Sequence, residues 1–181
     1  KSVTTPLKLP AAYKGRTDKG RREALEKYGS STAEITENAV MRSLMWFDET
    51  QNKDGSWGDK NKVENTALVV LAYMAHGETP SSEEFGVTVK KAAQFLAKYC
   101  EENDLSTHEY RNAIIAYALS SVYAMTGLPA YKGLAMETIR TIIEGQQVGG
   151  GWSYNYEKGD LYVVAISGWQ MQALKVAYDA N

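Results

Sequence analysis

The chain has 181 residues, of which 44% are hydrophobic and 23% are charged, and its formal net charge at pH 7 is −2. This length and composition predict a globular domain with a buried core, and the near-neutral charge argues against a nucleic-acid-binding surface. A single cysteine, Cys100, excludes an intramolecular disulfide framework and a cysteine-rich zinc site. No apolar run reaches the roughly 18 residues of a membrane span, so the sequence predicts no transmembrane segment.

Residues 1–30 are expected to form an extended lead-in with a short helix, because Pro6, Pro10 and Gly15 interrupt any regular period. Several lysines and arginines make this segment basic, and we interpret it as a solvated tail. A tether to an acidic membrane surface would require more basic residues or an anchor. A start at Lys1 and a stop at the end of a helical pattern are also what an excerpt of a longer protein would show.

Residues 31–181 are expected to form one domain of helical hairpins. The run Ser31-Thr32-Ala33-Glu34 has the capping-box pattern, and apolar residues then follow at helical spacing, so we predict a first helix over 33–50. Its partner is predicted over 64–75, with Gly77 as the stop.

The same organisation is predicted twice more along the chain. The second pair spans 84–101 and 108–125 and ends at Gly127, and the third spans 130–144 and 161–179, with Pro129 near its start and Gly145 between its helices. The three units are therefore about 31–80, 81–129 and 130–181. The second helix of each pair is more apolar than the first, which predicts an inner layer of second helices and an outer layer of first helices.

A motif recurs between the two helices of the first and third pairs. Gln51, Gly55 and Trp57 form a Gln-x-x-x-Gly-x-Trp pattern, and residues 146–152 repeat it with every position shifted by 95. A degraded middle copy lies between them, because residues 91–100 parallel residues 42–51 without the Gly-x-Trp ending. A shift of 95 is two periods of about 47, which is typical of a repeat architecture.

These paired helices and the repeated motif resemble the α/α toroid of terpenoid cyclases and protein prenyltransferases, and the motif resembles the QW repeat of the triterpene cyclases. The run Gly150-Gly151-Trp152-Ser153-Tyr154 also resembles bacterial prenyltransferase/squalene oxidase repeat proteins. The resemblance covers about residues 31–181. It implies an all-α, toroid-like stack of about three hairpins, whereas the family's complete ring has about six, so this chain is half a ring or closes with another copy.

The resemblance also implies which catalytic residues to look for. Triterpene cyclases use an Asp-x-Asp-Asp acid, prenyltransferases use Asp, Cys and His to bind zinc, and complement-like toroids use a Gly-Cys-Gly-Glu-Gln thioester. None of these patterns occurs here. We therefore name no catalytic residue, no metal ligand and no cofactor, and we expect Cys100 to be a small core residue.

Six motif residues are predicted to be structural: Gln51, Gly55, Trp57, Gln146, Gly150 and Trp152. We expect each glutamine amide to bond the free carbonyls that end the outer helix and the next loop at once. We expect each tryptophan to stack on that amide and to be buried under the loop, and each glycine to permit the tight turn. A binding rim at the starts of the inner helices is the other candidate, with Glu64, His108, Glu109, Tyr110, Arg111, Tyr154 and Asp160 as its members.

The sequence thus favours a non-catalytic binding or scaffold module whose partner is an apolar ligand or another protein, with self-association through an uncovered apolar face as one form. The alternative is an enzyme or carrier that acts on an isoprenoid or other lipid and has its catalytic residues outside this chain. The compartment is open, and an exported or cell-envelope protein is one expectation.

Overall fold

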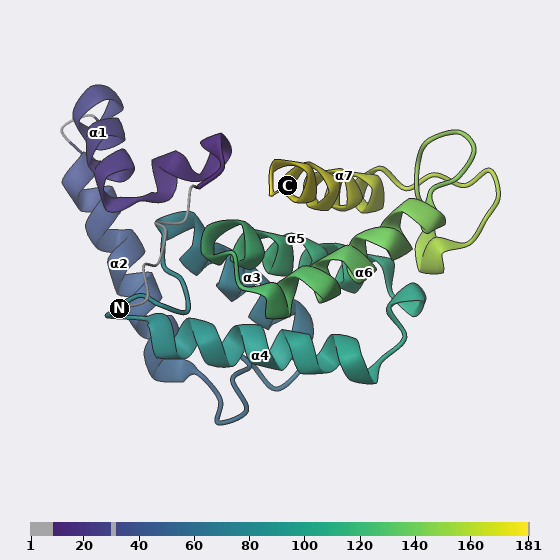
Figure 1. Cartoon of the computed structure of the whole chain (residues 1–181), viewed down its shortest axis with the longest axis horizontal. Coiled ribbons are helices and arrows are strands. Elements are labelled where there is room, and N and C mark those ends of the chain that lie inside the picture. Colours follow the sequence, from purple (N-terminus) through teal and green to yellow (C-terminus); the bar gives the residue numbers. More distant parts are fainter. Residues whose placement is uncertain (1–8, 30–31, 181) are drawn as a thin grey trace, which may run out of the picture.

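The computed structural model describes residues 9–29 and 32–180, and all regular elements within these ranges are helical (Figure 1). The prediction of an all-α fold is therefore confirmed. The elements are η1 (Ala11–Arg16), α1 (Asp18–Tyr28), α2 (Ala33–Thr50), α3 (Lys62–His76), α4 (Gly86–Glu102), η2 (Leu105–Thr107), α5 (Glu109–Thr126), α6 (Pro129–Gly145), η3 (Tyr154–Tyr156) and α7 (Val164–Asp179).

Helix α5 lies at the centre of the domain and packs against α3, α6 and α7 (Figure 1). It is buried on most of its circumference, from Asn112 near its start to Met125 near its end. Helices α3, α5 and α7 are the predicted inner helices, whereas α4 packs on α3 and α6 packs on α5. This arrangement is compatible with the two layers of a toroid.

The core follows from this central position. The main apolar cluster joins α3, α4 and α5, with Tyr73, Val89, Leu96, Ile115 and Leu119 each fully buried. A second cluster lies where α6 and α7 pack on α5, and it contains Ala116, Ile142, Trp152, Tyr156 and Ile166. The second motif is therefore part of the core of the third unit.

The predicted helix boundaries need one clear correction, at the start of the last helix. Residues 161–163 were expected to be helical, but α7 begins at Val164. Val163 has an extended backbone, and its amide donates to the carbonyl of Trp152 at 2.9 Å. This bond holds the end of the long loop against the second motif in an extended conformation, so the helix begins only after Val163. The first helix has the bounds predicted for it, although Ser31 of its capping box lies outside the described residues.

The lead-in contains the short helix predicted for it, α1, which has no buried residue, but its interpretation as a solvated tail is wrong at η1. Residues 11–16 form η1, and the Thr17 side chain caps α1 by accepting a hydrogen bond from the Gly20 amide. Tyr13 is only 2% exposed and belongs to the main core. The Arg21 guanidinium also donates to the carbonyl of His76 at the end of α3. The lead-in is thus fixed to the domain by an aromatic ring and by an arginine.

The two ends of the stack are less covered than its middle. Leu44 is the only buried residue of α2, and α7 buries one side through Ile166, Gln170, Ala173 and Val176. Large apolar side chains remain exposed on both helices, among them Trp46 and Met171.

Candidate functional site

The two copies of the motif adopt the same loop, which we call loop 1 (residues 51–57) and loop 2 (residues 146–152). Both begin with an extended glutamine directly after an outer helix. Gly55 and Gly150 have φ values of +88° and +93°, which favour glycine. The glutamine amide donates to the carbonyl of its own glycine in each loop, at 3.1 Å for Gln51 and 2.8 Å for Gln146.

The tryptophan indoles bind the carbonyls that end the outer helices. Trp57 Nε1 donates to the carbonyl of Phe47, Trp152 Nε1 donates to that of Ile142, and both distances are 2.8 Å. The carbonyls of Phe47 and Ile142 are therefore bound by the indoles and not by the glutamine amides, which corrects one half of the prediction, whereas the predicted bond from each amide to its loop is present. An indole has a single donor and no acceptor, so this one bond satisfies its only polar group while the ring is buried.

A hydroxyl at the start of the following inner helix completes each loop. The backbone amide of Trp57 donates to Thr66 Oγ1 at 3.2 Å, and that of Trp152 donates to Ser167 Oγ at 3.1 Å. Sequence reasoning did not assign this role to either residue. A hydroxyl residue near the start of each inner helix that follows a motif was the available signal.

The next outer helix covers loop 1. Gln51 Nε2 donates to the carbonyl of Thr88 in α4 at 2.9 Å, and the Thr88 hydroxyl donates to the carboxylate of Asp48. A Cβ placed on Gly55 would lie 2.6 Å from the carbonyl oxygen of Lys91, so α4 approaches the loop closely. Loop 1 therefore joins the first unit to the second.

No helix covers loop 2 in the described structure. A Cβ placed on Gly150 would meet no heavy atom within 4 Å, and Gln146 is exposed. The Lys158 ammonium donates to the carbonyl of Gln146 at 2.8 Å, from within the loop that leads to α7. Loop 2 thus has the internal geometry of loop 1 without the contact to a following unit.

The predicted binding rim is divided by the structure, and its first part is an ion pair between inner helices. Glu64 of α3 lies 2.7 Å from Nε of Arg111 of α5, and Arg111 Nη1 donates to the Tyr99 hydroxyl at 2.9 Å. Both charged side chains are about one quarter exposed. The pair therefore links α3, α4 and α5 near the starts of the two inner helices.

The second part of the rim is a buried polar network around Glu109, which is 6% exposed. The Glu109 carboxylate accepts a hydrogen bond from the Asn155 amide at 2.7 Å, and its backbone carbonyl accepts one from Gln170 Nε2 at 3.0 Å. Asn112 Nδ2 donates to the Tyr156 hydroxyl, which in turn donates to Gln170 Oε1. Burial raises the pKa of Tyr156 to about 12, so this hydroxyl keeps its proton.

The other predicted rim residues are not gathered into this network. His108, Tyr154 and Asp160 are exposed, and Tyr110 is half-buried. No group of three or more His, Cys, Asp or Glu side chains within residues 9–29 and 32–180 is arranged to hold a metal ion. Burial raises the pKa of the Cys100 thiol to about 12, which keeps this group in its unreactive form.

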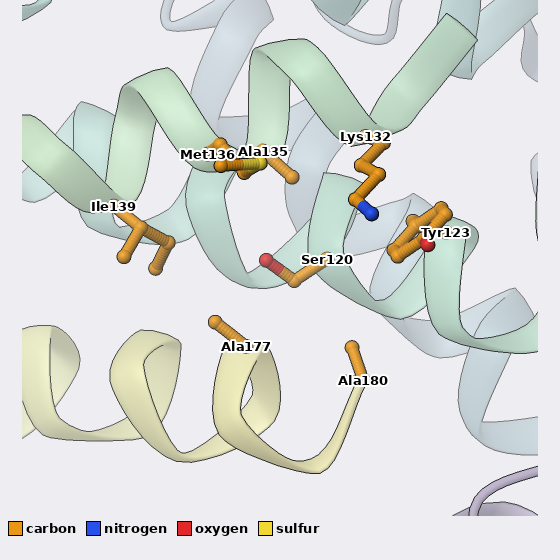
Figure 2. A pocket seen from close by; sticks show the side chains of 8 residues that line it. All are labelled: Ser120, Tyr123, Lys132, Ala135, Met136, Ile139, Ala177 and Ala180. Carbon is orange, nitrogen blue, oxygen red and sulfur yellow. The ribbon is translucent and has the colours of Figure 1, made fainter. Parts of the chain in front are cut away.

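An apolar cavity lies between α5, α6 and the end of α7, and sequence reasoning did not anticipate it. Its volume is about 70 Å³, and Figure 2 shows the side chains that line it: Ser120, Tyr123, Lys132, Ala135, Met136, Ile139, Ala177 and Ala180. The Ser120 hydroxyl is buried and has no hydrogen-bond partner among the described residues. No local pattern encodes this cavity, because three separate helices form it.

No helix in the described part of the chain combines the length and the hydropathy that crossing a bilayer requires. Comparisons with protein-family models, with curated proteins and with solved structures find no match to this chain.

Proposed function

We propose that the chain is a non-catalytic binding or scaffold module built as a terpenoid-cyclase-like stack of helical hairpins. The observation that carries this proposal is the use of the repeated motif as a connector. In loop 1 the glutamine amide binds its own loop and the next outer helix at once, through Gly55 and Thr88. In this copy of the motif, the glutamine amide therefore holds two units together.

The environment of the candidate chemical groups supports the same proposal. A general acid or a nucleophile must reach the substrate with the required protonation state. The Glu109 carboxylate is buried on a backbone amide, Glu64 is paired with Arg111, and the Cys100 thiol is buried with a raised pKa. Each of these groups has a structural partner or location that accounts for its position.

The alternative, an enzyme or carrier for an isoprenoid or lipid, has one observation in its favour. The cavity in Figure 2 is lined mostly by apolar atoms, and the partly exposed side chain of Met136 is among its lining residues. Its volume of about 70 Å³ is roughly half that of the engineered cavity of about 150 Å³ that holds one benzene ring. A prenyl chain would therefore fit only if α7 moved away from α6.

Native mass spectrometry after incubation with a lipid extract and with farnesyl diphosphate tests this proposal. We expect the protein to retain no lipid-sized mass, and we expect farnesyl diphosphate to remain unconverted. A retained mass or a converted substrate would overturn the scaffold proposal in favour of the alternative. The variant Ala177→Leu, which narrows the cavity, would then show whether this cavity holds the ligand. If it does, the variant should no longer retain the ligand.

A further inference from the structure

We propose that loop 2 and the exposed end of α6 bind a second copy of this chain. In this contact, α2 of the second copy packs on loop 2 in the same way that α4 packs on loop 1 within one chain. This inference rests on the scaffold function and names its partner. The contact is head-to-tail, because it joins the third unit of one copy to the first unit of another.

The internal junction between the first two units is the template for this contact. At this junction, α4 contacts three groups of the first unit: the Asp48 carboxylate, the Gln51 amide and the side of Gly55 that lacks a Cβ. These groups lie on the last turn of α2 and on the loop that follows it. A helix covers them from outside and buries Thr88 to 6% exposure.

The third unit repeats this docking surface and leaves it uncovered. At the same spacing of 95 residues, Ile143, Gln146 and Gly150 replace the three groups of the first unit. Ile143 is 58% exposed, and Val148, which replaces Lys53 at the tip of the loop, is fully exposed. Ile143 and Val148 thus form an exposed aliphatic edge beside Gly150, where an added Cβ would meet no heavy atom within 4 Å, while Tyr162 packs on the neighbouring Gly149 and Gly151.

The register between outer helices identifies the segment that fits. A shift of 46 from α4 to α6 pairs four buried positions of one helix with four buried positions of the other. These are Phe85, Val89, Ala92 and Leu96 in or next to α4, and Tyr131, Ala135, Thr138 and Ile142 in α6. The remaining step, from α2 to α4, is therefore 49 residues.

In this register, α2 presents the side that α4 uses. Ala39 corresponds to Thr88, Arg42 to Lys91 and Trp46 to Phe95. Ala39 and Arg42 are exposed, and Trp46 is 58% exposed. Ile35 lies one helical turn before Ala39 and is 65% exposed. The first outer helix thus carries an uncovered apolar edge at the place where its counterpart α4 contacts the preceding unit.

The two uncovered surfaces also match in polarity. The internal junction pairs a carboxylate with a hydroxyl, Asp48 with Thr88. The corresponding residues at the proposed contact are Ile143 and Ala39, so both partners have become apolar. A change at one surface alone would have left a polar group against an apolar one, which is unfavourable when buried. Because the surfaces differ, their association is heterologous, and it forms a ring if the rotation closes.

Site-directed cross-linking tests the orientation. Chains carrying Ala39→Cys are mixed with chains carrying Ile143→Cys and oxidised with glutathione disulfide, which accepts the two electrons. We expect a cross-linked pair that contains one chain of each kind. The control replaces Ala39→Cys by Val87→Cys, on a 69% exposed position of α4. Equal cross-linking with this control, or Ile143→Cys chains that link to each other as readily, would overturn the head-to-tail contact.

Sedimentation measurements test the association itself. Val148 is fully exposed, so Val148→Asp should fold normally while placing a charge in the contact. We expect at least a tenfold weaker self-association for Val148→Asp and no change for the control Val87→Asp. A wild-type chain that stays monomeric up to high concentration would refute this inference. That result would leave the scaffold proposal standing, since the scaffold proposal fails only on a bound lipid or a product.

Discussion

Replacing Trp57 by alanine removes the ring that loop 1 buries. The structure allows the loss of stability to be divided into a part from ring packing and a part from the indole hydrogen bond. The side chain is 5% exposed and contacts the ring of Phe47 edge-on at a centroid distance of 6.3 Å. Truncation of a buried aromatic residue to alanine costs about 3–5 kcal/mol. We therefore expect Trp57→Ala to lower the free energy of unfolding by about that amount.

The variant Trp57→Phe separates the hydrogen bond from the ring. It retains most of the apolar surface but removes the donor to the Phe47 carbonyl, which leaves a part-buried acceptor without its partner. Such a loss costs about 1–3 kcal/mol. The same substitution at Trp152 should cost a similar amount, because its indole makes the equivalent bond at the same length.

Urea unfolding followed by far-ultraviolet circular dichroism measures these differences without relying on tryptophan fluorescence. Trp46→Ala at low protein concentration is the matched control, because this tryptophan is 58% exposed and should cost no more than about 1 kcal/mol. If Trp57→Ala were no more destabilising than Trp46→Ala, the structural role of the motif would be refuted. Phenylalanine variants as stable as the wild type would refute the role of the indole hydrogen bond.

Three further predictions use differences between matched positions or states. In urea titrations, Gln51→Ala should lower the free energy of unfolding by about 1–2 kcal/mol, and Gln146→Ala should lower it by less than about 0.5 kcal/mol. The reason is that only Gln51 binds a following helix, and equal losses would contradict it. Gly55→Ala should lower the melting temperature more than Gly150→Ala, because both strain a positive φ but only the first meets a neighbouring carbonyl; the reverse order would refute the difference in covering. Burial raises the pKa of the Cys100 thiol from 9.0 to about 12, so the unfolded chain loses this proton first and stability falls as pH rises from 9 toward 12. Between pH 8 and pH 10.5 the wild type should therefore lose about 2 kcal/mol more than Cys100→Ala, and parallel pH profiles would contradict the raised pKa.

Local signals were sufficient to predict the helices. The capping pattern and the apolar spacing placed the first helix at the bounds of α2. Gly77 and Gly127 end α3 and α5 with left-handed backbones, as expected for glycine after a helix. The start of α7 was missed because it depends on the bond between Val163 and Trp152, which are far apart in sequence. The toroid itself stays a prediction.

The site was less accessible to sequence reasoning, because its contacts join separate elements. The motif residues were identified, but the helix-end carbonyls are bound by the indoles and not by the glutamine amides. Composition gave no indication that Tyr13 enters the core from a basic, proline-containing segment. Glu109 was proposed as part of an open rim, whereas the fold buries it beside Asn155 and Gln170. Burial of this kind depends on which helices become neighbours.

The central position of α5 has a consequence for the dynamics of the domain. In stacked repeats, resistance to local opening accumulates where a unit has neighbours on both sides. Backbone amides of α5 should therefore exchange with deuterium only through global unfolding, whereas those of α2 should exchange through partial opening of the first unit. Since α2 has Leu44 as its only buried residue, α2 would open before the central helix α5 does. Any partner that holds α2 in place would then slow exchange far from its own contact surface.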